Sequence, residues 1–187
     1  MNYKRQPFEA GFTIGFIGGG QLARMSALQA FRFGMNIAVY ATSSSTEPVE
    51  QMTPHVVRGG LDDEIKLIEF ARMCDVITLE NEFVDGNLLT RVREASGTPI
   101  YPLPSSFVQI GDKLTEKDTF KNAGIPVTPY AHINGTSDLE RFGDQYGWPY
   151  VLKSAKGGYD GYGNATVKDV NEAIVAFDKL GGNRAQV

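Results

Sequence analysis

Short apolar segments alternate with amphipathic segments through the first 110 residues. The apolar runs predict buried strands at residues 12–17, 37–40, 55–57, 76–79 and 99–101. Helical periodicity between them predicts helices that begin at Gln21, at Asp62 and near Asp85. Strands that alternate with helices through short connections form parallel βαβ units. The pattern therefore predicts an α/β fold with a doubly wound parallel sheet.

The first two predicted helices each carry a stripe of apolar residues. In the first helix one face consists of Leu22, Met25, Leu28 and Phe31. In the second helix the predicted buried stripe consists of Ile65, Leu67 or Ile68, Ala71 and Met73. We expect Cys74, which follows that stripe, to be a buried packing residue.

The pattern changes near residue 112. A helix is expected over residues 112–122, with Lys113, Lys117 and Lys121 on one side, and Gly124-Ile125-Pro126 ends it. Strands at 130–133, 149–153 and 165–167 and helices at 137–146 and 169–180 follow. The last two strands flank a short loop, so they are predicted to be antiparallel. We therefore divide the chain into a domain at 1–111 and a second, α+β domain at 112–187.

Composition and charge exclude several classes of protein. The chain has 187 residues, of which 42% are hydrophobic and 21% charged, as expected for a globular protein. No apolar run approaches the roughly 20 residues that cross a bilayer, so we expect no membrane partner. A net charge of -4 without a basic block argues against nucleic acid. One cysteine suits a cytoplasmic location, and two distant histidines argue against a histidine metal site.

A glycine turn follows the first predicted strand. Gly18-Gly19-Gly20 leads into Gln21 and Leu22 at the start of a helix, as in turns whose backbone N–H groups bind phosphate. A dinucleotide site also needs an acid at the end of the second strand, and Ala41-Thr42 provides none. This argues against NAD or FAD. A phosphate of another ligand, or a tight turn without a ligand, both remain open.

A second glycine-rich segment lies between the last two predicted strands. Four glycines fall within residues 157–163, more than a structural hairpin needs. The segment is either a flap that folds its amides over phosphates or a plain exposed loop. Lys153 precedes it and Lys113 opens the earlier helix. Two ammonium groups beside such a flap suit a triphosphate.

Two acids follow the fourth predicted strand. Glu80 and Glu82 lie where open α/β sheets bind ligands. Their carboxylates are candidates to hold a ligand amine or hydroxyls, or to cap the next helix.

Five segments together resemble one family. GFIGGGQLARM, LENE, DKLTEK, GIP and YVLKSAKGGYDGYGN are similar to the N-terminal half of the 5-(carboxyamino)imidazole ribonucleotide synthase family, ligases of the ATP-grasp superfamily. The resemblance implies a biotin-carboxylase-like N-terminal domain followed by the beginning of an ATP-grasp domain. It also implies the family's cytoplasmic reaction in purine (IMP) biosynthesis. There ATP and bicarbonate, with Mg²⁺, form carboxyphosphate, which carboxylates aminoimidazole ribonucleotide (AIR). A homodimer is implied for the complete protein.

The resemblance also assigns roles to residues. The implied ATP-binding residues are Lys113, Lys153, Gly158, Tyr159, Asp160, Gly161, Tyr162, Gly163 and Asn164. The implied ribonucleotide-binding residues are Gly19, Gly20, Gln21, Leu22, Glu80 and Glu82. Gln21 and Leu22, with the glycine turn, would lie at the ribonucleotide phosphate, and Glu80 or Glu82 would face the substrate. Tyr159 and Asp160 would reach the reacting centre, where Asp160 would handle the amine proton. The metal ligands are expected beyond residue 187.

Two positions depart from the family. Tyr162 replaces a usual Arg or Lys, and Ala41-Thr42 replaces a common Asp-Pro. The chain also ends in what reads as the start of another strand, so we expect it to be a fragment that is inactive alone. A paralogue with another acceptor, or a non-catalytic module that binds nucleotide phosphates, remains an alternative.

Overall fold

The computed structural model describes residues 4–156, 162–181, 185 and 186. The chain forms two compact units, Met1–Val108 and Gln109–Val187, and each is described by itself. The boundary between residues 111 and 112 stays a prediction.

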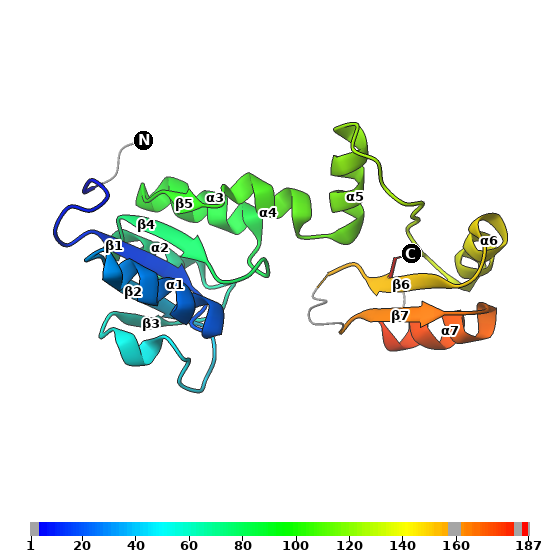
Figure 1. Cartoon of the computed structure of the whole chain (residues 1–187), viewed down its shortest axis with the longest axis horizontal. Helices are drawn as coiled ribbons and strands as arrows, with labels where there is room; N and C mark the ends of the chain where they lie inside the picture. Colours follow the sequence, from blue (N-terminus) through cyan, green and yellow to red (C-terminus); the bar gives the residue numbers. More distant parts are fainter. Residues whose placement is uncertain (1–3, 157–161, 182–184, 187) are drawn as a thin grey trace. The chain divides into compact units, whose positions relative to one another are not determined.

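Unit 1 is built on a parallel sheet, which confirms the predicted fold class. Its five strands lie in the order β3-β2-β1-β4-β5 (Figure 1), and every neighbouring pair is parallel. Their bounds are β1 Thr13–Ile17, β2 Asn36–Ala41, β3 Val56–Arg58, β4 Val76–Leu79 and β5 Ile100–Tyr101.

Helices cover both faces of this sheet. The helical elements of unit 1 are α1 Gln21–Arg32, η1 Glu50–Met52, α2 Glu64–Met73, α3 Gly86–Ser96 and α4 Pro104–Ile110, which extends just past the unit boundary. On one face, α1 packs against alternate β2 residues such as Ile37 and Val39. On the other face, α2 and α3 enclose Ala38 and Tyr40. The two cores on opposite faces define a doubly wound sheet.

The apolar stripe of α1 does not coincide with its buried face, whereas the predicted stripe of α2 is confirmed at Leu67 and Ala71. In α1 the buried residues are Ala23, Ala27 and Ala30, while the larger residues of the stripe are exposed: Leu22, Met25, Leu28 and Phe31. In α2 the buried residues are Leu67, Phe70 and Ala71. The prediction was wrong for Ile65 and Met73, which are exposed because they fall on the solvent side of the helix.

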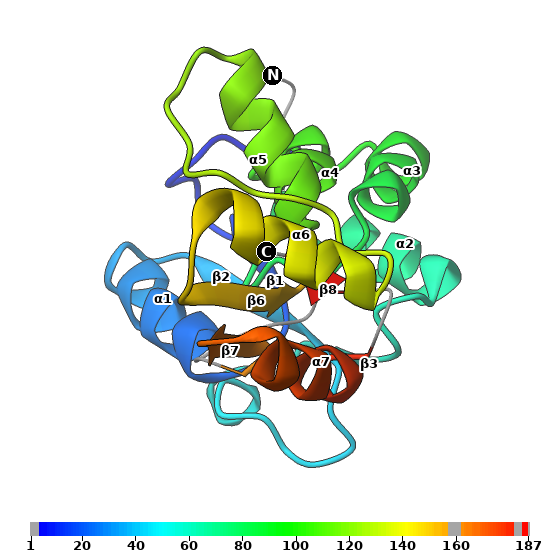
Figure 2. The same cartoon turned by 90° about the vertical axis from the view of Figure 1, so that its right-hand side faces the viewer.

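Unit 2 is a small α+β layer. Its strands are β6 Tyr150–Ser154, β7 Asn164–Val167 and β8 Ala185–Gln186, in the order β7-β6-β8, and both pairs are antiparallel. Its helices are α5 Lys113–Asn122, α6 Thr136–Tyr146 and α7 Val170–Lys179. The helices α6 and α7 lie on one face of the sheet (Figure 2), and their apolar side chains form a core with Tyr150, Leu152 and Val167 of the strands. A strand predicted at 130–133 is absent, since only His132 makes an isolated β-bridge there.

None of the helices in the described ranges is both long and apolar enough to cross a membrane.

Candidate functional site

The glycine turn lies at the topological switch point of the sheet, where the order of strand addition reverses. The chain runs from β1 outward to β2 and β3 and then returns to β4 on the other side of β1. Open α/β sheets bind ligands at such a point, outside the carboxyl ends of the strands. The turn follows the carboxyl end of β1, and Glu80 follows the carboxyl end of the neighbouring strand β4. The fold therefore brings the predicted glycine turn and the predicted carboxylate together.

Glu80 caps the helix that the glycine turn opens. One carboxylate oxygen accepts the Gly20 N–H at 2.7 Å, and the other accepts the Leu22 and Ala23 N–H groups at 3.1 and 3.5 Å. The anion at this helix N-terminus is therefore a side chain of the protein. The alternative that Glu80 caps the following helix was wrong, because Asp85 caps α3.

A third acid, Glu47, lies against the same turn and was not predicted from the sequence. Its side chain turns back toward the end of β2, where one oxygen accepts the N–H groups of Thr42 and Ser43 at 2.9 and 2.6 Å. The residue is only 8% exposed. Its other oxygen, Oε2, is buried and has no hydrogen-bond partner among the described residues.

Glycine is required where these acids approach the turn. A Cβ atom on Gly19 would lie 2.2 Å from Glu47 Oε2, and one on Gly20 would lie 2.3 Å from Glu80 Oε1. Gly19 and Gly20 are therefore in direct contact with the two carboxylates, while Gln21, Leu22 and Glu82 are exposed near them in sequence. Whether these predicted residues bind a ribonucleotide stays a prediction.

In unit 2 the backbone brings the two predicted phosphate-binding lysines to neighbouring segments. The Lys113 N–H donates to the carbonyl of Ala155 at 3.0 Å, two residues beyond Lys153. The Lys113 ammonium group lies 3.2 Å from Glu116, and its side chain is 45% exposed. An ion pair this exposed contributes little, so a phosphate can replace it.

Lys153 lies on the open face of the unit 2 sheet. Along β6 the buried residues are Tyr150 and Leu152, which face the helices, while Val151 and Lys153 are exposed. Asn164 pairs with Lys153 across the strands and is also exposed. The open face thus presents an ammonium group beside an amide.

The glycine-rich segment is only partly described. Gly158, Tyr159, Asp160 and Gly161 lie outside the described residues. Tyr162 is 71% exposed, and the Gly163 carbonyl accepts the Ser154 N–H at 2.7 Å. This bond holds the segment's end beside Lys153.

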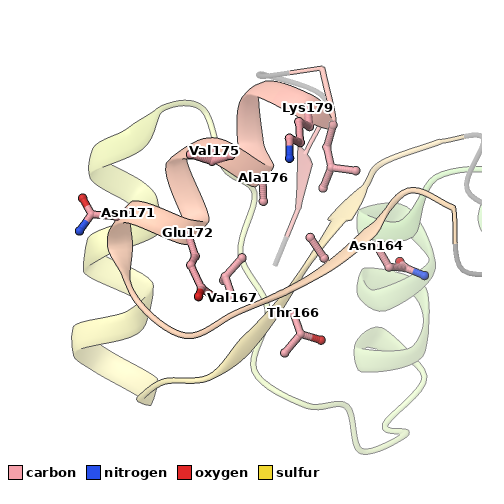
Figure 3. Close-up of a pocket in the computed structure, with 10 residues that line it drawn as sticks. Asn164, Thr166, Val167, Asn171, Glu172, Val175, Ala176 and Lys179 are labelled. Carbon is pink, nitrogen blue, oxygen red and sulfur yellow. The ribbon is translucent and has the colours of Figure 1, made fainter.

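A cavity of about 510 Å³ lies elsewhere in unit 2, between α7 and β7. It is lined by Val175, Ala176 and Lys179 from the helix and by residues of the strand (Figure 3). Of the predicted site residues that the structure describes, only Asn164 borders it. The cavity therefore does not mark the predicted phosphate site.

Within the described residues, no three acidic, histidine or cysteine side chains are grouped as a metal site requires. These residues therefore do not fit a resident Mg²⁺ ion held by protein ligands alone.

The doubly wound parallel sheet, with a capped glycine turn at its switch point, is followed by an antiparallel α+β unit, and this order of units has the architecture of the ATP-grasp class. Residues 12–110 match the family described as the ribonucleotide synthetase preATP-grasp domain, and residues 118–187 match the ATP-grasp domain. The chain belongs to the ribonucleotide synthetase preATP-grasp family.

Relatives of known activity match both units. The N5-carboxyaminoimidazole ribonucleotide synthase of Staphylococcus aureus (strain MRSA252) is 34% identical over 180 residues, which are 93% of this chain and 46% of the relative. The chain thus spans about half the length of this relative. The match confirms the resemblance inferred from the five sequence segments.

Solved structures give the same result. The S. aureus N5-carboxyaminoimidazole synthetase with ADP has a TM-score of 0.86 at 30% identity, over 95% of this chain and 47% of the other. The Aspergillus clavatus N5-carboxyaminoimidazole synthase was solved with ADP and 5-aminoimidazole ribonucleotide. Its TM-score is 0.82 at 27% identity, over 94% of this chain and 46% of the other.

Proposed function

We propose that this protein takes part in the ATP- and bicarbonate-dependent carboxylation of AIR, as a carbon–nitrogen ligase of purine biosynthesis. The observation that carries the proposal is the match of both units to N5-carboxyaminoimidazole ribonucleotide synthases, one of which was solved with ADP and AIR. The chain corresponds to about half of those proteins, so it supplies part of the catalytic apparatus.

The reaction that we propose has two steps. A bicarbonate oxygen attacks the γ-phosphorus of ATP, which gives carboxyphosphate and releases ADP. The exocyclic amine of AIR then attacks the carboxyl carbon, inorganic phosphate leaves, and the amine loses one proton. We assign that proton to Asp160, with Tyr159 beside the reacting centre. Both lie outside the described residues.

Unit 2 is the proposed ATP-binding part. Lys113 and Lys153 would neutralise the phosphates, because phosphoryl transfer depends on cationic groups where negative charge develops. The bond between Lys113 N–H and the Ala155 carbonyl supports this role, since it joins the start of α5 to the end of β6. Gly158, Gly161, Tyr162, Gly163 and Asn164 would cover the nucleotide.

Unit 1 is the proposed ribonucleotide-binding part. The capped turn of Gly19 and Gly20, with Gln21, Leu22 and the carboxylates of Glu80 and Glu82, would lie against AIR. Because Glu80 already accepts three N–H groups at this helix N-terminus, its charge disfavours a phosphate placed directly on those amides. We therefore assign the ligand's hydroxyl and amine donors, more than its phosphate, to this edge.

Three further properties belong to the same proposal. Mg²⁺ would bind together with ATP, and its protein ligands would lie outside the described residues. The protein would act in the cytoplasm, which the single cysteine supports. It would form a homodimer, as the family resemblance implies.

Titration of MgATP into the chain tests the ATP-binding part. Lys153→Met and Lys113→Met each remove one ammonium group from an exposed side chain. We expect each to weaken binding roughly tenfold or more, the contribution of a charge-assisted hydrogen bond. Lys168→Met, an exposed lysine of the same unit outside the predicted site, is the control and should bind as wild type does. Equal affinity in all three variants, or no ATP binding by wild type, contradicts the proposal.

A further inference from the structure

The carboxylate of Glu47 takes the place of the acid that the end of β2 lacks in the sequence. β2 ends at Ala41, and the next two residues, Thr42 and Ser43, donate their N–H groups to Glu47 Oε1. A residue six positions beyond the strand thus places a carboxylate at its carboxyl end. In doubly wound sheets an acid at this position accepts a hydrogen bond from a ribose hydroxyl.

The loop that carries Glu47 is held by several polar contacts. Arg58, the last residue of β3, donates to the carbonyls of Ser43 and Ser45 and pairs with Glu50. Glu50 Oε1 in turn accepts the N–H of Glu47 at 2.8 Å. These bonds fix the backbone on both sides of Glu47, so the side chain is held in place against the turn.

The second carboxylate oxygen of Glu47 is the atom that favours a ligand contact. Oε2 is buried, without a partner among the described residues, and it occupies the space where a side chain at Gly19 would begin. A buried polar atom without a hydrogen bond costs free energy that a donor would recover. Gly19 lies directly against this atom, and its carbonyl accepts the Val49 N–H at 3.0 Å, so a ligand would reach Oε2 by displacing this bond and the turn of three glycines, which carries no side chains of its own.

We propose that Glu47 is a ribonucleotide-binding residue whose Oε2 accepts a hydrogen bond from a ribose hydroxyl when the ligand displaces the turn at Gly19. The inference rests on the proposed function for the identity of the ligand. The inference adds a residue that makes binding specific for ligands with free ribose hydroxyls.

The variant Glu47→Gln separates binding from a purely structural role. It keeps an oxygen for Thr42 and Ser43 and removes the buried charge. If Oε2 serves a ligand, Glu47→Gln unfolds in urea at the wild-type concentration or higher but binds AIR roughly tenfold to a hundredfold more weakly. A structural role would instead lower the urea midpoint. Glu69→Gln, an exposed glutamate of α2 in the same unit and outside the proposed site, is the control, with AIR affinity within about twofold of wild type.

Two ligand comparisons complete the test. The 2′,3′-dideoxy analogue of AIR should bind wild type and Glu47→Gln equally, because it has no hydroxyl to donate. Equal AIR affinity in wild type and Glu47→Gln, or a lowered urea midpoint, overturns the inference and leaves the proposed function intact. If NAD⁺ binds instead of AIR, and Glu47→Gln weakens it, the ribose contact stands and the proposed function fails. If wild type binds neither ligand, both fail.

Discussion

Removal of the Glu80 carboxylate should destabilise unit 1 and leave unit 2 unchanged. Glu80→Ala leaves the N–H groups of Gly20, Leu22 and Ala23 without their acceptor. A helix cap contributes about 0.5–2 kcal/mol, and hydrogen bonds to a charged group are the stronger ones. Since the 3.5 Å contact with Ala23 is weak, we expect a loss of about 2 kcal/mol in the free energy of unfolding of unit 1.

Each unit has its own probe in this experiment. Hydrogen exchange of the α1 amides reports on unit 1, and a loss of about 2 kcal/mol speeds exchange through unfolding roughly 30-fold. The only tryptophan, Trp148, belongs to unit 2, where it stacks on Tyr150 with ring centroids 4.6 Å apart. Its fluorescence transition in urea should not move.

Glu82→Ala is the control, because Glu82 is exposed and lies two residues beyond the cap. Its effect should stay within about 0.5 kcal/mol. The capping account is refuted if Glu80→Ala exchanges its α1 amides at the wild-type rate, or if Glu82→Ala speeds them as much.

Two further predictions concern packing and pH. A Cβ atom on Gly143 would lie 2.1 Å from the Trp148 ring, so Gly143→Ala should destabilise unit 2 by roughly 1–3 kcal/mol and shift the Trp148 emission. Gln145→Ala, at an exposed position of the same helix α6, should do neither, and equal urea midpoints for the two variants would contradict the packing argument. Burial raises the pKa of the Cys74 thiol to about 12, an effect that Lys4 opposes and Asp75 reinforces. Above pH 9 the unfolded chain therefore loses a proton that the folded unit keeps, so stability falls as pH rises, by up to roughly 1.4 kcal/mol per pH unit. Cys74→Ala should reduce the fall in the free energy of unfolding of unit 1 between pH 9 and 11, measured by urea unfolding monitored through hydrogen exchange. The same pH dependence in Cys74→Ala and wild type would contradict the role of this thiol.

Local patterns in the sequence were sufficient to predict much of the fold. Apolar runs and the glycine turn located β1 and the start of α1, and strand alternation predicted the parallel sheet that the structure confirms. The buried face of α1 was less predictable, because small alanines let the helix approach the sheet and leave the larger side chains outside. Sequence periodicity does not distinguish these two faces.

The candidate site was predictable only where its residues follow a strand directly. Glu80 directly follows β4, and its position at the end of a predicted strand was enough to identify it as a candidate. Glu47 lies in a loop rich in Ser and Thr, and only the tertiary contacts with Thr42, Ser43 and Gly19 bring it to the turn. The contacts with Thr42 and Ser43 span only four or five residues within an irregular loop, and the contact with Gly19 joins distant segments, so neither leaves a periodic signal in a single sequence.

Calorimetric titration of AIR and of MgATP into the same chain tests most directly whether the two units bind two different phosphorylated ligands. We predict that both ligands bind, that Lys153→Met loses affinity for MgATP alone, and that Glu47→Gln loses affinity for AIR alone. Binding of NADH with no heat from AIR or MgATP would contradict this prediction.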